Sequence, residues 1–171
     1  MGRAVSQTGF AMAAAALLLA FSSGVALAAT FAGDAGPNTI LGTSSSDRIE
    51  GRGGGDSLFG GGDRDAVYGD YGGDLIKGGP GADDAGFVVG PGARGLYGGA
   101  GEDRVEGNGG GDLIVGGAGE DLLLGGAGDD QISDPGRGAA VDIIRCGDGV
   151  DFVEASPADR VAADCERVER P

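Results

Sequence analysis

The chain has 171 residues, of which 40 are glycine, and it contains no histidine and no tryptophan. So few bulky side chains argue against a compact globular core packed in the ordinary way. The formal net charge of −15 argues against nucleic acid and anionic membranes as partners, because both present the same sign of charge, and it favours cations.

The N-terminal segment 1–29 has the layout of a secretory signal peptide. Arg3 lies near its start, an apolar run covers 10–21, and the small residues 26–28 form an A-x-A cleavage pattern. A retained membrane anchor is the alternative, but the run is shorter than the roughly 20 apolar residues that a spanning helix needs. We expect a mature chain that begins near Ala29, with no membrane span, in an extracellular or cell-surface location.

A nine-residue unit repeats through residues 33–154. Glycine is favoured at places one, two and four, aspartate stands at place six, and an aliphatic residue stands at place eight. Four successive units from Gly98 keep this pattern: GGAGEDRVE, GNGGGDLIV, GGAGEDLLL and GGAGDDQIS. The sixth place holds Asn38 in the first unit and aspartate at these later positions: Asp47, Asp56, Asp65, Asp74, Asp83, Asp103, Asp112, Asp121, Asp130, Asp142 and Asp151.

Two insertions interrupt the repeat. With residues 87–88 set aside, VGPGARGLY (89–97) forms a unit that has Arg94 in the sixth place, and a second insertion covers 134–136. Counting units in this way places Arg94 between Asp74 and Asp112. We therefore expect Arg94 to divide the aspartates into two blocks and to act as a tethered counter-charge. A decayed repeat with Arg94 turned to solvent is the alternative.

The unit predicts an all-β fold built from stacked coils. Three-residue strands such as 122–124 are too short to stand alone, but two units make one 18-residue coil, and successive coils can stack as parallel strands about 4.8 Å apart. The eighth-place residue then points inward and fills a thin core between two sheets. Glycine in the turns allows positive φ and close backbone approach, so that turn carbonyls can converge on an ion.

Stacking also aligns the sixth-place aspartates along each edge. Neighbouring carboxylates repel by an amount on the order of 1 to 4 kcal/mol per close pair. A hard divalent cation that takes six to eight oxygen ligands removes this conflict, and Ca²⁺ fits better than the smaller Mg²⁺, which gives up its water reluctantly. The alternatives are aspartates that serve only turn geometry, or a disordered chain.

This pattern resembles the calcium-binding nonapeptide of the repeats-in-toxin (RTX, haemolysin-type) family, G-G-x-G-x-D-x-U-x. The resemblance covers residues 33–154 and implies a right-handed parallel β-roll, in which each six-residue turn binds Ca²⁺ and the other three residues form a strand. It therefore implies that the sixth-place aspartates are metal ligands, within a repeat domain at 30–154.

The C-terminal segment 155–171 differs in composition and is interpreted as a cap over the open end of the roll. Ser156 could begin a helix, or a last strand could form at 160–161. Because export leads to an oxidising compartment, we expect a disulfide between Cys146 and Cys165 rather than two free thiols. Two cysteines without a histidine make a poor zinc site.

The chain is not expected to be an enzyme. A GDSL sequence at 55–58 resembles that of an esterase family, but hydrolysis of that kind needs an imidazole base and the chain has no histidine. We expect a secreted calcium-binding β-roll that folds on binding Ca²⁺ and has a structural or cell-envelope role. The alternative is a calcium-dependent adhesin or ligand-binding module that binds an unidentified extracellular ligand through Tyr68, Tyr71, Phe87 and Tyr97. Many family members leave the cell by a C-terminal signal, so toxin-like export or activity is not implied.

Overall fold

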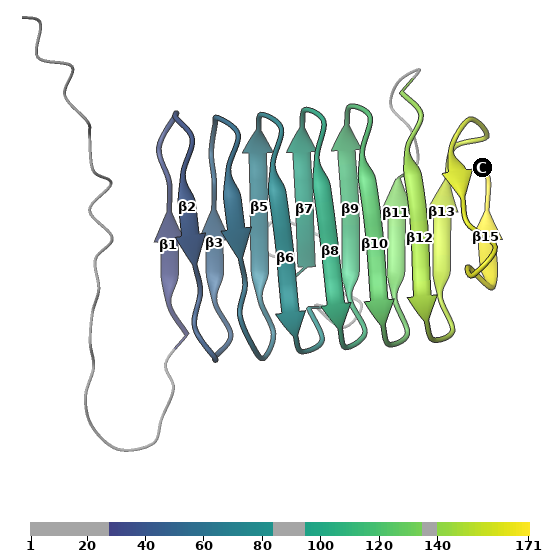
Figure 1. The fold of residues 1–171 in the computed structure, drawn as a ribbon, viewed down its shortest axis with the longest axis horizontal. Coiled ribbons are helices and arrows are strands. Elements are labelled where there is room, and N and C mark those ends of the chain that lie inside the picture. The colour runs from purple at the N-terminus through teal and green to yellow at the C-terminus, as the bar shows by residue number, and fades with distance from the viewer. Residues whose placement is uncertain (1–27, 84–94, 135–139) are drawn as a thin grey trace, which may run out of the picture.

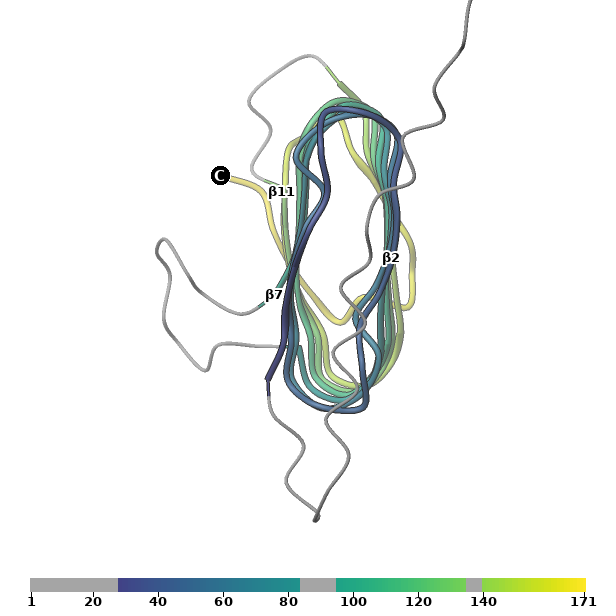
Figure 2. The ribbon, with the colours of Figure 1, turned by 90° about the vertical axis from the view of Figure 1, so that its left-hand side faces the viewer.

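The computed structural model describes residues 28–83, 95–134 and 140–171. Every regular element in these ranges is a β-strand, and the strands form two parallel sheets that face each other along the whole stack (Figure 1). The chain alternates between the sheets, so one coil consists of a strand from each sheet and the two turns between them. Viewed along the stack, the coils superpose as a flattened oval (Figure 2). The fold is therefore a parallel β-solenoid, as expected for a β-roll.

Strands with odd and even numbers belong to different sheets. The odd sheet contains, in spatial order, β1 (Thr30–Ala32), β3 (Arg48–Glu50), β5 (Ala66–Tyr71), β7 (Gly95–Ala100), β9 (Leu113–Ala118), β11 (Gln131–Asp134), β13 (Phe152–Ala155) and β15 (Arg167–Glu169). The even sheet contains β2 (Thr39–Leu41), β4 (Ser57–Phe59), β6 (Leu75–Pro80), β8 (Arg104–Gly109), β10 (Leu122–Ala127), β12 (Ile143–Asp148) and β14 (Arg160–Val161).

The core is a double column of eighth-place side chains between the two sheets. Each is completely buried: Ile49, Leu58, Val67, Ile76, Leu96, Val105, Ile114, Leu123, Ile132, Ile144 and Val153. Phe31, Ile40 and Val161 pack against the ends of the column and are only partly buried. The prediction that this place forms a thin core is confirmed, and the core is one aliphatic layer from each sheet.

Strands in the middle of the stack are longer than the three residues expected. β10 covers Leu122–Ala127, because the first three places of the following turn continue the hydrogen bonding between coils. The N–H of Gly61, for example, donates to the carbonyl of Gly78 at 2.9 Å, although both residues belong to turns. The turn backbone therefore contributes to the sheet as well as to the bend.

The stack is continuous where a break was expected. The N–H of Asp74 donates to Oδ1 of Asp103 at 2.8 Å, and the N–H of Asp83 donates to Oδ1 of Asp112 at 2.7 Å. Gly95 occupies the seventh place, directly after the sixth-place Asp83, because its N–H donates at 3.2 Å to the carbonyl of Asp65, one coil away. Residues 84–94 are thus one insertion within a single unit, and the prediction of a separate unit at 89–97 is wrong.

The two-block division at Arg94 is wrong for the same reason. No sixth place exists between Asp74 and Asp103, or between Asp83 and Asp112, since these residues are already neighbours in the stack. Arg94 itself lies outside the described residues. Counting nine-residue units fails here because an insertion longer than nine residues can be mistaken for an extra unit. Only the contacts between coils reveal the true length of the insertion.

The C-terminal segment continues the solenoid. β14 pairs with β12 and β15 with β13, so each sheet gains a last strand, and residues 155–171 contain no helix. Of the two structures considered for this segment, the strand at 160–161 forms and the helix from Ser156 does not. The boundary at 155, with the capping role, stays a prediction.

Most of the expected signal peptide, 1–27, lies outside the described residues. Within the described part of the chain, no helix has the length and apolarity to span a membrane.

Candidate metal centre

The six-residue turns share one backbone conformation from residue 51 onward. Places two and four adopt positive φ in each six-residue turn from 51–56 to 146–151 that the structure describes, including at residues other than glycine. Arg52 (φ 76°), Asp70 (φ 73°) and Asn108 (φ 77°) hold the second place, and Asp63 (φ 68°) holds the fourth. Left-handed φ is costly for residues with a side chain, which explains why glycine dominates these two places.

Glycine is required at the first place for a steric reason rather than for its φ angle. A Cβ on Gly98 would lie 2.5 Å from Oδ2 of Asp103 in the same turn and 2.6 Å from the carbonyl oxygen of Gly116 in the next coil. Gly51, Gly60 and Gly107 have equivalent neighbours. The first place is therefore glycine because a carboxylate and a carbonyl from two coils converge on it, which leaves no room for a side chain.

The sixth-place residues form two rows, one along each edge of the solenoid. The even row precedes the even-numbered strands and contains Asn38, Asp56, Asp74, Asp103, Asp121, Asp142 and Asp159. The odd row precedes the odd-numbered strands and contains Asp47, Asp65, Asp83, Asp112, Asp130, Asp151 and, at its end, Glu166. All eleven aspartates singled out from the sequence lie in these rows, and each is at most 5% exposed.

One oxygen of each carboxylate accepts a hydrogen bond from a backbone N–H of the neighbouring coil. The backbone N–H of Asp103, for example, donates to Oδ1 of Asp121 at 2.9 Å, and that of Asp112 donates to Oδ1 of Asp130 at 2.9 Å. Hydrogen bonds of a backbone donor to a carboxylate are about twice as strong as neutral ones. The rows therefore join coil to coil along both edges.

The second oxygen has no hydrogen-bond donor at many of these positions. Oδ2 is buried and accepts no hydrogen bond in this group: Asp56, Asp74, Asp103, Asp121, Asp130 and Asp151. A buried charged oxygen without a partner is costly and calls for a proton or a cation. These oxygens point into the turns, where carbonyl oxygens also gather, so the donor set is all oxygen and suits a hard cation such as Ca²⁺.

Burial raises the pKa of these carboxyl groups. The pKa of Asp103 rises to about 7, through burial first and then through the neighbouring carboxylates of Asp121 and Asp74. Burial, with a smaller contribution from neighbouring carboxylates, raises the pKa of Asp121 and Asp130 to about 6. The pKa values of the following residues rise for the same leading reason: Asp56, Asp74, Asp142 and Asp151. Without a cation, the rows therefore disfavour the ionised form that neutral pH imposes on an ordinary aspartate.

The rows extend beyond the eleven aspartates expected from the sequence. The N–H of Asp142 donates to Oδ1 of Asp159 at 3.2 Å, and the N–H of Asp151 donates to Oε2 of Glu166 at 3.0 Å. The signal was present in the triplets Asp-Arg-Val (159–161) and Glu-Arg-Val (166–168), which repeat the acid-x-aliphatic pattern of 103–105. It was missed because the segment has lost the glycines that define the unit.

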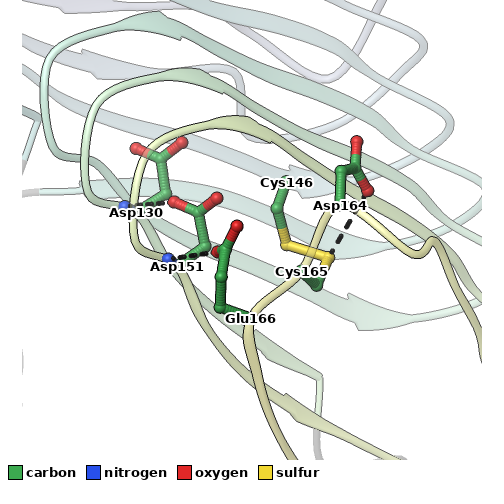
Figure 3. The surroundings of a disulfide bond; sticks show 6 residues. All are labelled: Asp130, Cys146, Asp151, Asp164, Cys165 and Glu166. Atoms are coloured by element: carbon green, nitrogen blue, oxygen red, sulfur yellow. Dashed lines mark hydrogen bonds between the residues drawn. A yellow bond between two sulfur atoms is a disulfide. The ribbon is translucent and has the colours of Figure 1, made fainter.

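A disulfide joins the last two coils beside the odd row. Cys146 and Cys165 are bonded, with Cα atoms 5.2 Å apart, as expected from the sequence. Figure 3 shows Asp130, Asp151 and Glu166 in succession next to this bond. Because Glu166 directly follows Cys165, the disulfide holds the segment that supplies the last acidic side chain of the odd row.

Comparison with known proteins agrees with this geometry. The model of the RTX calcium-binding nonapeptide repeat matches residues 32–67, 68–84 and 97–132, just over half of the chain. The chain therefore belongs to the RTX calcium-binding nonapeptide repeat family. No curated protein matches it.

Proposed function

We propose that this protein is an exported β-roll that folds when Ca²⁺ binds in its turns, and that its role is structural, at or outside the cell envelope. The observation behind this proposal is the alignment of buried Oδ2 atoms that lack a hydrogen-bond donor along both edges. Sixth-place aspartates of adjacent coils, with the turn carbonyls between them, would supply the oxygen ligands. The ions would neutralise the rows that otherwise repel.

Extracellular calcium suits this mechanism. Extracellular calcium modules bind with dissociation constants on the order of 10⁻⁴ to 10⁻³ M, so the chain would remain unfolded before export and fold afterwards. From the length of the rows we expect on the order of five to eight bound ions. The absence of histidine and the near-complete use of the described chain for repeats support a role without catalysis.

A calcium titration followed by circular dichroism tests the proposal. Calcium-free protein at pH 7.5 should have little β-sheet signal and should gain it in a cooperative transition with Ca²⁺, but not with equal Mg²⁺. Asp74→Asn should weaken the transition, because it removes a buried charge from the even row. The matched control is Asp148→Asn, which removes one exposed charge from a turn of the odd edge. Full β-sheet signal in calcium-free protein at pH 7.5 would contradict the proposal.

One observation favours a second candidate, a calcium-dependent adhesin or ligand-binding module. Tyr68 and Tyr97 stack on the odd sheet with ring centroids 5.0 Å apart and an interplanar angle of 4°, and Arg48 lies 4.6 Å from the Tyr68 centroid. Tyr71 is 74% exposed, whereas Phe87 lies outside the described residues. A pull-down on whole cells with and without Ca²⁺ tests this candidate. Calcium-dependent retention that Tyr68→Ala and Tyr97→Ala both abolish, with β-sheet signal intact, would support it.

A further inference from the structure

Asp134 occupies a place that glycine holds in the earlier turns. It ends β11 and begins the turn toward β12, so it is the first-place residue of that turn. Its side chain is only 2% exposed. A buried acid therefore stands where the repeat otherwise leaves room for a carbonyl and a carboxylate.

The carboxylate of Asp134 enters the turn of the preceding coil. Gly98, one coil earlier, faces Oδ2 of Asp103 and the carbonyl oxygen of Gly116. Gly116 faces Oδ2 of Asp121 and, instead of a carbonyl oxygen, Oδ2 of Asp134. At this level of the stack, a carboxylate oxygen has replaced a backbone carbonyl oxygen.

Three acidic side chains meet at this point. Asp121, Asp134 and Asp142 each offer a carboxylate oxygen, and these oxygens lie within 4.8 Å of one another. Within the described residues no other three side chains of the acidic, cysteine or histidine type meet as closely. All three are at most 3% exposed, and Oδ2 of Asp121 accepts no hydrogen bond.

We propose that Asp121, Asp134 and Asp142 form a three-carboxylate calcium site that binds more tightly than the other turns and fills first. This inference rests on the proposed function, since it ranks one turn above others that also bind Ca²⁺. Calcium affinity in oxygen sites rises with the number of charged ligands and with the rigidity of the site. The ordinary turns have carboxylates only from the sixth places, whereas this turn adds a third from the first place.

The position of this site gives it a role in assembling the stack. Asp121 precedes β10, Asp134 ends β11 and Asp142 precedes β12, so one ion would join two successive coils. The N–H of Asp121 reaches Oδ1 of Asp142 across 21 residues rather than the usual 18, because this coil contains three additional residues. The first ion to bind would therefore fasten a coil that has three more residues to order than a regular 18-residue coil.

A competition titration of Ca²⁺ against a chromophoric chelator at pH 7.5 tests the inference on the whole protein. The wild-type protein should show a tightest site at least tenfold stronger than the remaining class. Asp134→Asn keeps the shape and removes the charge, and Asp134→Gly restores the residue of the other turns. Both variants should move the tightest site into the weaker class, a loss of about tenfold or more in its affinity. Asp148→Asn, the matched loss of one exposed acid, should leave the tightest site unchanged.

The possible outcomes separate this inference from the proposed function. A single uniform class in the wild-type protein, or a tightest site that persists in both Asp134 variants, would overturn the inference and leave calcium binding by the other turns intact. Failure of the wild-type protein to bind any Ca²⁺ would overturn the proposed function itself. If both variants fail to gain β-sheet signal at saturating Ca²⁺, Asp134 is needed for folding in general and the ranking of sites is refuted.

Discussion

Calcium-free protein should fold better in mild acid than at neutral pH. In the folded state the pKa of Asp103 is about 7, and those of Asp121 and Asp130 are about 6, against an ordinary value of 3.8. Between these values the folded protein retains protons that the unfolded chain has released. Stability therefore falls as pH rises from about 4 to about 7, which is the sign expected for raised aspartate pKa values.

The size of this effect is large. One pKa unit corresponds to about 1.4 kcal/mol, so ionisation costs the calcium-free fold about 4 kcal/mol at Asp103 and about 3 kcal/mol each at Asp121 and Asp130. Asp103 and Asp121 are neighbours, so their costs do not simply add, but the cost at Asp103 alone is a large share of the whole stability of a small domain, which is about 5 to 15 kcal/mol. At neutral pH the calcium-free roll should therefore be unfolded or nearly so, and near pH 4.5 it should recover β-sheet signal without any metal.

Circular dichroism of protein passed over a chelating resin, recorded from pH 4 to 8, measures this effect. Asp103→Asn mimics the protonated acid and should raise calcium-free stability at pH 7.5 by up to about 4 kcal/mol, while it weakens calcium binding. Asp148→Asn, in an exposed turn, should do neither. If the β-sheet signal without calcium is independent of pH or increases from pH 4 to 7, the reasoning from buried carboxyl groups is refuted.

Three further changes test other parts of the stack. Gly98→Ala should raise the Ca²⁺ concentration at the folding midpoint severalfold, because its Cβ would lie 2.5 Å from a carboxylate oxygen. The control Gly109→Ala, whose Cβ would meet nothing within 4 Å, should leave that midpoint nearly unchanged. Replacing both Cys146 and Cys165 by serine should lower the free energy of unfolding in saturating Ca²⁺ by about 3 kcal/mol, measured by urea denaturation, and an unchanged value would exclude a stabilising role for the disulfide. Arg52→Gly should raise that free energy by up to about 1 kcal/mol, because Arg52 has φ of 76°, and a loss of stability would show that the turn tolerates a side chain there.

The repeat by itself was sufficient to predict the stacking, the core and the rows. A period of nine with aspartate sixth and an aliphatic residue eighth allows each unit to pair with the unit two further on, so Leu123 becomes core and Asp121 lies beside Asp103. These relations follow from local periodicity, because every coil repeats the contacts of its neighbour. The disulfide between Cys146 and Cys165 was also expected.

Only the tertiary structure decided where the period is interrupted and how the acidic residues meet. The nine-residue period can be continued after an insertion of any length, so residues 84–94 seemed to contain part of a further unit. The hydrogen bond between Asp83 and Asp112 shows that they do not. Likewise the repeat placed Asp134 in an insertion and gave Glu166 no position in the odd row. The carboxylate of Asp134 meets those of Asp121 and Asp142, and the carboxylate of Glu166 ends the odd row. Strand pairing between distant segments makes these contacts, which nine-residue periodicity does not encode.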